Sequence, residues 1–124
     1  MRVLLDTHAV LWALEGSNAL SEVARQTIVS LENEVLVSSA SAWEIAIKRT
    51  LGKLDAPQAL GAAIDEAGFV RRLIRFEDCE KLIDLPPHHR DPFDRMLVSQ
   101  ALVDGIPVVT RDPWIKKYGV QTIW

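Results

Sequence analysis

The sequence predicts a three-layer α/β/α fold with a mainly parallel sheet of four to five strands. Short apolar, β-branched runs alternate along the chain with longer segments whose apolar residues recur at helical spacing, and no repeat or long linker interrupts them. Strands separated by helices are joined in parallel, and the helices cover both faces of the sheet. The length of 124 residues is typical of one domain, so we expect a single domain over residues 1–124.

The first half of the chain predicts two strands and four helices. A strand at residues 2–5 leads into a helix at 7–15, which Gly16 ends, and a second helix begins at Ser21. The apolar face of this second helix is expected to consist of Leu20, Val23, Ala24, Ile28 and Leu31. After a strand at 35–37, two helical segments follow. Their apolar residues stand at helical spacing: Trp43, Ala46, Ile47, Leu51 and Leu54, then Leu60, Ala63, Ile64 and Ala67 before Gly68.

The second half adds three strands and two helices. A strand is expected at 73–76 and a short helix at 77–84, followed by a rigid loop at 85–90 whose two prolines fix the backbone. Asp91 and Pro92 open the next helix, and Gly105 ends it. Its inward-facing residues are expected to be Phe93, Leu97, Val98, Ala101 and Leu102. Final strands are expected at 107–110 and 120–123.

Composition predicts a soluble globular protein. Hydrophobic residues make up 48% and charged residues 25%, and no apolar run approaches the ~18 residues that a membrane span needs. Nothing at the start resembles a signal peptide, so we expect a cytoplasmic protein with no membrane partner. Cys79 is the single cysteine, and its apolar neighbours at helical spacing predict a buried core thiol.

Four acidic residues stand where predicted strands give way to helices: Asp6, Glu44, Asp94 and Asp112. Parallel-sheet proteins bind ligands beyond the carboxyl ends of their strands, so these side chains are expected to meet in one pocket. Each also has an ordinary explanation. Ser41 and Glu44 form a possible capping box, Asp6 and Asp112 suit N-caps, and Asp94 suits the first turn of a helix.

Four carboxylates in one pocket would indicate a metal site. Two carboxylates at ~4 Å repel by roughly 4 kcal/mol at an effective dielectric near 20, so the cluster needs protonation or a cation. Mg²⁺ or Mn²⁺ suits oxygen ligands, and such an ion can activate water against a phosphodiester. The sequence contains no phosphate loop, nucleophile elbow or cysteine–histidine pairing that would indicate another catalytic mechanism. His8, His88 and His89 lack zinc-ligand spacing and are expected on the surface or in loops.

The formal net charge of −3 argues mildly against a nucleic-acid partner, because phosphate binding usually leaves a basic footprint. Without the four site carboxylates the chain has 13 acidic and 14 basic residues. Several basic residues flank the site segments: Lys48, Arg49, Lys53, Arg90, Arg95, Arg111, Lys116 and Lys117. On these clusters alone, an ordinary solvated surface is the favoured interpretation.

Four segments resemble the PIN-domain ribonucleases, particularly toxins of the VapC type: RVLLDTHAVLWAL, VSSASAWEIAIKRTLGKL, HRDPFDRMLVSQAL and VVTRDPWIKKYGV. The resemblance spans nearly the whole chain and implies one PIN domain over residues 1–124. It implies a Mg²⁺- or Mn²⁺-dependent endoribonuclease, the toxin of a toxin–antitoxin pair, with an RNA substrate, a small cognate antitoxin and frequent homodimers. By the same resemblance, Asp6, Glu44, Asp94 and Asp112 form the catalytic and metal-binding quartet, with Asp6 and Asp94 as principal ligands.

Some roles stay open. Glu44 is a further ligand or orients water, and Asp112 binds a second ion, acts through water or caps its turn. Asp91 is expected to cap its helix and support the site from its edge. Thr7 and Thr110 could hold carboxylates or waters, although strand-end hydrogen bonding is their ordinary role. Three tryptophans serve either core packing or a dimer or partner surface: Trp12, Trp114 and Trp124.

Two alternatives of other classes also stay open. The first is a PIN-like domain that binds RNA without cutting it. The second is a magnesium-binding signalling receiver domain, which shares the architecture and the acidic pocket. A receiver requires adjacent carboxylates after the first strand and an aspartate at the end of a middle strand. Here Asp6 is followed by Thr7, and the second strand ends in Ser38 and Ser39.

Overall fold

The computed structural model describes residues 1–124 and contains one five-stranded sheet with strand order β3-β2-β1-β4-β5. The strands, all paired in parallel, are β1 (Arg2–Leu5), β2 (Glu34–Ser38), β3 (Val70–Arg72), β4 (Val108–Val109) and β5 (Thr122–Ile123). The chain runs outward from β1 through β2 and β3, then crosses to β4 and β5. This order differs from the 2-1-3-4-5 order of a receiver domain, so that alternative is wrong. The strand order reverses direction between β1 and β4, and this topological switch point is where parallel-sheet proteins bind ligands.

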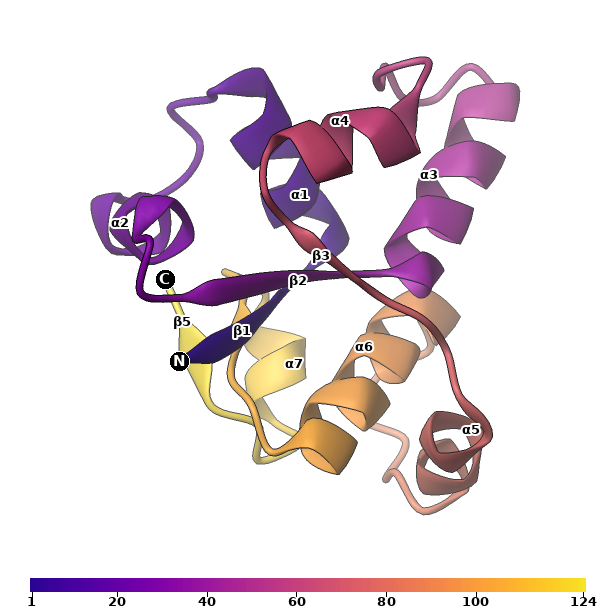
Figure 1. Cartoon of the computed structure of the whole chain (residues 1–124). Coiled ribbons are helices and arrows are strands. Elements are labelled where there is room, and N and C mark those ends of the chain that lie inside the picture. The colour runs from indigo at the N-terminus through magenta and orange to yellow at the C-terminus, as the bar shows by residue number, and fades with distance from the viewer.

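Seven helices complete the fold and cover both faces of the sheet (Figure 1). On one face lie α1 (Thr7–Glu15), α2 (Glu22–Val29) and α4 (Leu60–Glu66). On the other lie α5 (Phe76–Ile83), α6 (Pro92–Asp104) and α7 (Pro113–Lys116), and α3 (Ser39–Thr50) begins directly at the carboxyl end of β2. None of the helices has the length and apolar character of a membrane span.

Two hydrophobic cores, one on each face, hold the three layers together. Because successive strand residues point to opposite faces, Val3 and Leu5 of β1 join the core beneath α1 and α2, whereas Leu4 packs against α6 residues such as Leu97. These four residues are all fully buried. The predicted three-layer α/β/α fold with a parallel sheet is therefore confirmed.

The third strand lies earlier than the sequence predicted. The expected strand at 73–76 is wrong, because β3 is Val70–Arg72 and α5 already begins at Phe76. Leu73 and Ile74 look like core residues in the sequence, yet they are 64% and 36% exposed. The side chain that anchors β3 is instead the buried Arg72.

The expected inner faces of α2 and α3 are also partly wrong. In α2 only Ala24 and Ile28 are buried, whereas Val23 faces solvent, and the exposed Leu31 lies beyond the end of the helix. In α3 the residues with helical spacing form an exposed stripe, which we call the α3 stripe: Trp43, Ile47 and Leu51, with exposed fractions of 59%, 36% and 61%. The buried face of α3 consists of Ala40, Ser41, Glu44 and Ile45, so this helix turns a partly polar side inward.

Cys79 is exposed, so the prediction of a core thiol is wrong. The reason is that α5 turns only Leu82 toward the core and presents its other apolar residues to solvent. Phe76 and Ile83 are 85% and 83% exposed, and they lie seven residues apart on the same side of the helix. Together with Cys79 they form what we call the α5 stripe.

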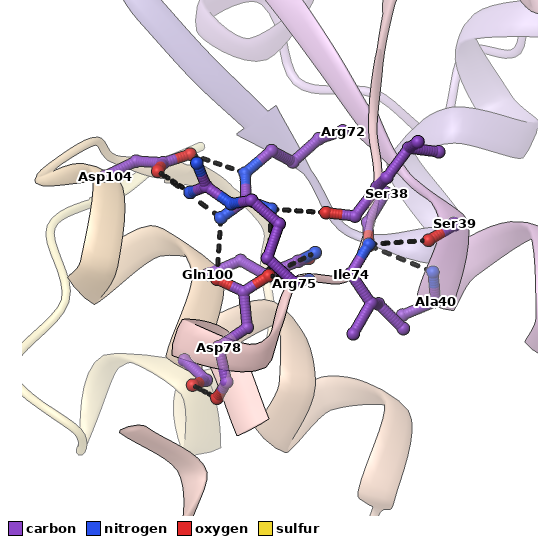
Figure 2. Close-up of polar contacts among 11 residues, drawn as sticks. Ser38, Ser39, Ala40, Arg72, Ile74, Arg75, Asp78, Gln100 and Asp104 are labelled. Atoms are coloured by element: carbon purple, nitrogen blue, oxygen red, sulfur yellow. Dashed lines mark hydrogen bonds and ion pairs between the residues drawn. The ribbon is translucent and has the colours of Figure 1, made fainter. Parts of the chain in front are cut away.

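A buried ionic network fastens α5 and α6 to β3 (Figure 2). The Arg72 guanidinium donates to both Asp78 oxygens at 2.8 and 2.7 Å and to Asp104 at 2.7 Å. Asp78 is fully buried and also accepts from the Arg75 amide at 2.8 Å. Burial alone would raise the pKa of Asp78, but these hydrogen bonds outweigh it and lower the pKa below the ordinary value. Because Asp104 ends α6, the network holds the helix whose first turn carries Asp94.

Candidate metal centre

A pocket at the carboxyl ends of β1 and β4 brings together the four carboxylates singled out in the sequence: Asp6, Glu44, Asp94 and Asp112. The rest of its lining consists of Thr7, His8, Trp12, Lys48, Asp91, Arg111 and Pro113. The carboxylates come from the β1–α1 junction, α3, the first turn of α6 and the β4–α7 junction. The expectation that all four stand where a strand gives way to a helix is therefore wrong for Glu44, which lies within α3, and for Asp94, because the element before α6 is the helix α5. The fold therefore gathers segments from nearly the whole chain around one opening, at the switch point of the sheet.

Asp6 caps α1 and lines the pocket at the same time. Its Oδ1 accepts from the Ala9 amide at 2.8 Å, and the residue is 6% exposed. Burial raises the pKa of Asp6, while hydrogen bonds from the Thr110 side chain and the Ala9 amide act in the opposite direction. The cap occupies Oδ1, so the capping role leaves the second oxygen for another ligand.

Glu44 is held from two elements. The Thr7 hydroxyl donates to its Oε1 at 2.6 Å, and the Lys48 ammonium donates to its Oε2, also at 2.6 Å. The expected capping box with Ser41 is wrong, because α3 begins three residues earlier and Ser38 caps it by accepting from the Ala40 amide at 3.0 Å. Glu44 is 4% exposed within the helix. Its inward position therefore serves the pocket and not the helix end.

Asp94 is the carboxylate with the most perturbed acidity. Burial first, and then the charges of Asp91, Asp6, Glu44 and Asp112, raise its pKa from 3.8 to about 8. Asp91 caps α6 as predicted, with Oδ1 accepting from the Phe93 and Asp94 amides at 2.9 and 3.1 Å. The cluster thus holds more negative charge than its protein neighbours neutralise.

Asp112 has the capping role that the sequence allowed. Its Oδ1 accepts from the Trp114 amide at 2.9 Å, and its own amide donates to Thr110 Oγ1 at 3.0 Å. The Thr110 side chain also acts to lower the pKa of Asp6. Both Thr7 and Thr110 therefore hold site carboxylates or their backbone, which is more than ordinary strand-end bonding.

His89 is a pocket-edge residue that sequence reasoning missed. His88 is exposed as expected, but the His89 side chain is only 12% exposed and its Nε2 lies 3.6 Å from Asp94 Oδ2. Nε2 is buried without a hydrogen-bond partner. Nδ1 lies 2.8 Å from the Tyr118 hydroxyl, and the ring is stacked with Trp114 at an interplanar angle of 4°. The two prolines at 86 and 87, which make this loop rigid, are the sequence signal that could have drawn attention to it.

The donor set fits a divalent cation. His89, Asp94 and Asp112 each offer one ligand atom, and the three atoms lie within 4.8 Å of one another. Ligands at about 2.1 Å from one octahedral ion lie about 3.0 to 4.2 Å apart, so small side-chain movements suffice. Carboxylate oxygens suit Mg²⁺ and Mn²⁺, and an added imidazole nitrogen favours the transition metal. A bound cation would give His89 Nε2 the partner that it lacks, and it would offset the negative charges that surround Asp94.

Comparison with known proteins identifies the family and the fold of the chain. The family model described as the PIN domain matches residues 3–121. The chain is similar in structure to the crystal structure of VapBC2 from Rickettsia felis bound to a DNA fragment from their promoter. The TM-score is 0.68 at 14% sequence identity, and the match covers 98% of this chain and 97% of that one. No curated protein sequence matches the chain. Because the family model covers almost all of the sequence, the chain belongs to the PIN-domain family.

Proposed function

We propose that the protein is a metal-dependent endoribonuclease that hydrolyses RNA phosphodiester bonds, with one PIN domain over residues 1–124. The observation that carries this proposal is the convergence of Asp6, Glu44, Asp94 and Asp112 on one pocket. Membership of the PIN family supports a nuclease. A cytoplasmic location is part of the same proposal, because the RNA substrate is found there.

The four carboxylates have distinct roles in this proposal. Asp6 and Asp94 would be the principal ligands of Mg²⁺ or Mn²⁺, and Glu44 and Asp112 would complete the site directly or through water. A bound ion supplies a water of lowered pKa and neutralises charge that develops on the phosphate. Thr7 and Lys48 orient Glu44 from opposite oxygens. Asp91 and Asp112 order the starts of α6 and α7 through their caps. The chain thus supplies a preorganised acidic site that needs no nucleophilic side chain.

Purified protein with single-stranded RNA, in Mg²⁺, Mn²⁺ or chelator, tests the proposal. We expect Asp6→Asn and Asp94→Asn each to lower cleavage roughly 100-fold or more while circular dichroism shows an intact fold. Asp65→Asn is the matched control, since Asp65 is an exposed carboxylate paired with Arg71 outside the pocket. Unchanged cleavage in both site variants would contradict the proposal, and RNA binding without cleavage in either metal would identify a non-cleaving RNA-binding domain.

We further propose that the protein is the toxin of a toxin–antitoxin pair, held inactive by a small antitoxin that docks on the α3 stripe. The stripe lies on the helix that carries Glu44 and Lys48 into the pocket, so a partner docked there would lie beside the pocket. The Trp43 ring meets Phe93 of α6 edge-on at 5.1 Å, which extends the apolar surface to a second helix. An arginine of the antitoxin could pair with the carboxylates in bidentate fashion.

The toxin proposal has its own test. Expression should arrest growth, and co-expression of the neighbouring reading frame should relieve the arrest. Substituting Trp43→Ser and Ile47→Ser should weaken this relief without lowering cleavage by the purified protein. Val23→Ser, another exposed apolar position but on α2, serves as the control. Relief that is unaffected by the α3 substitutions would place the antitoxin elsewhere.

A homodimer is the remaining part of the proposal, and the α5 stripe is the surface that supports it. None of its residues lines the pocket, so two protomers could bury these stripes against each other and leave both pockets open. Exposed apolar patches are typical of association surfaces.

A further inference from the structure

Arg111 lies at the pocket beside five carboxylates but pairs with none of them. Its guanidinium carbon lies 4.7 Å from the centroid of the Trp12 ring, and both residues line the pocket. No ion pair of the chain involves Arg111. Lys48, the other lysine or arginine of the lining, is already bound to Glu44 at 2.6 Å. Arg111 is therefore the uncommitted positive charge of this acidic pocket.

The Trp12 ring provides the support that keeps Arg111 in place. His8 stacks on this ring at a centroid distance of 5.3 Å, and Trp124 contacts it at 5.8 Å. Trp12 is half-buried, whereas Arg111 is exposed. A guanidinium that lies over an indole ring keeps its N–H groups free along its edge for a planar acceptor. The arrangement presents a preorganised hydrogen-bond fork at the rim of the pocket.

A phosphate fits this fork better than a nucleobase does. The Trp12 ring already carries the guanidinium and the His8 ring, so the group offered to a ligand is a positive charge rather than a bare aromatic face. Guanidinium groups bind phosphate oxygens in bidentate geometry. Because Arg111 directly precedes Asp112, a phosphate bound there would be next to one held at the carboxylates. The rest of the pocket lining, dominated by acidic groups, would otherwise repel the phosphates that flank the cleaved bond.

We propose that Arg111, supported by Trp12, binds a backbone phosphate of single-stranded RNA adjacent to the cleaved bond. This subsite rests on the proposed ribonuclease function, and it names the contact that positions the strand over the metal centre. Removal of one phosphate contact reduces the slope of log K against log salt concentration by about 0.7 for a single strand. The subsite therefore has a signature that is independent of catalysis.

Fluorescence anisotropy with a labelled single-stranded RNA tests the subsite in the cleavage-deficient Asp6→Asn background, with Asp94→Asn as a second background. Arg111→Gln should weaken binding and reduce the salt slope by about 0.7. Trp12→Phe should retain most of the affinity, and Trp12→Leu should lose part of it, because only an aromatic face supports the guanidinium. Arg25→Gln, which removes the same charge from α2 outside the pocket, should leave both quantities unchanged.

The outcomes separate the subsite from the nuclease proposal. If Arg111→Gln matches Arg25→Gln in affinity and slope, or if neither background binds the RNA, the subsite is overturned. In the cleaving protein, Arg111→Gln should raise KM more than it lowers kcat, because a contact to a non-reacting phosphate contributes mainly to binding. A reduced salt slope in a protein that never cleaves RNA would support the subsite while the nuclease proposal fails.

Discussion

The Thr7 hydroxyl donates a 2.6 Å hydrogen bond to Glu44, and this bond joins the first residue of α1 to the middle of α3. Both residues are buried, at 5% and 4% exposure. The Ser41 hydroxyl lies 3.0 Å from Thr7 Oγ1 and extends the contact. A site carboxylate is thus oriented by a residue that directly follows another site carboxylate, Asp6.

Thr7→Val removes this hydrogen bond while nearly preserving the side-chain shape. We expect the free energy of unfolding to fall by about 1–3 kcal/mol, because a buried acceptor loses its donor. Mn²⁺ affinity, measured by isothermal titration calorimetry, should fall roughly 10-fold, as is typical when a group that orients a ligand is lost. Thr7→Ser keeps the hydroxyl and should retain most of the stability and most of the Mn²⁺ affinity. Equal losses in the valine and serine variants would show that packing of the methyl group is what matters.

The raised pKa of Asp94 predicts a pH-dependent stability of the metal-free protein. The pKa is about 8 in the folded chain, against an ordinary value of 3.8. Between these values the folded protein holds a proton that the unfolded chain has released, so stability should fall as pH rises from about 4 to 8. Urea denaturation in chelator measures this dependence. Asp94→Asn should flatten it, and added Mn²⁺ should restore stability at the alkaline end in the wild type only. A flat profile in the wild type would contradict the prediction.

Arg72 is predicted to be a stabilising residue of the fold. Arg72→Met should lower the free energy of unfolding by about 3–5 kcal/mol, because it leaves the buried Asp78 charge unpaired. The double variant Arg72→Met with Asp78→Leu should recover much of this loss, since neither buried charge remains. Thermal and urea unfolding of the two variants measure the difference.

The same network predicts acid sensitivity. The pKa of Asp78 lies below its ordinary value of 3.8, so its contribution is complete above that value and is lost as pH falls below it. In the double variant Arg72→Met with Asp78→Leu, the decrease in stability at low pH should be smaller by the contribution of Asp78. An unchanged acid midpoint would show that other carboxylates dominate unfolding at low pH.

The α5 stripe predicts the dimer surface. Phe76→Ser combined with Ile83→Ser should shift the protein from dimer to monomer in analytical ultracentrifugation, without loss of RNA cleavage. Cys79 lies within this stripe, so its reaction with maleimide should be slower in the dimer than in the double variant. Leu73→Ser, at a 64% exposed position outside α5, is the control. A protein that is monomeric without any substitution would contradict the prediction.

Local signals in the sequence were enough to place most helices and strands. The strand at Arg2–Leu5, the helix at Thr7–Glu15 ending at Gly16, and the helix from Pro92 to Gly105 follow from apolar spacing and end residues. These local signals failed at positions where an apolar residue is exposed or a charged residue is buried. Leu73 and the α3 stripe are exposed apolar residues, while Arg72 and Glu44 are buried charged ones. Each of these two buried charges is held partly by a distant residue, Arg72 by Asp104 and Glu44 by Thr7, and no local pattern reveals those partners.

The sequence by itself determined the order of elements and the positions of Asp6 and Asp112 at strand ends, because these depend on residue spacing and on the rule that parallel strands share one carboxyl edge. Glu44, inside α3, and Asp94, in the first turn of α6, reach the same pocket only through helix packing. Only the tertiary structure decided which neighbours orient those carboxylates. The Thr7–Glu44 bond, the approach of His89 to Asp94 and the placement of Arg111 on Trp12 all join segments from different elements. Such contacts arise from how helices pack across the sheet, and hydrogen-bond and cation–π geometry exists only once that packing is complete.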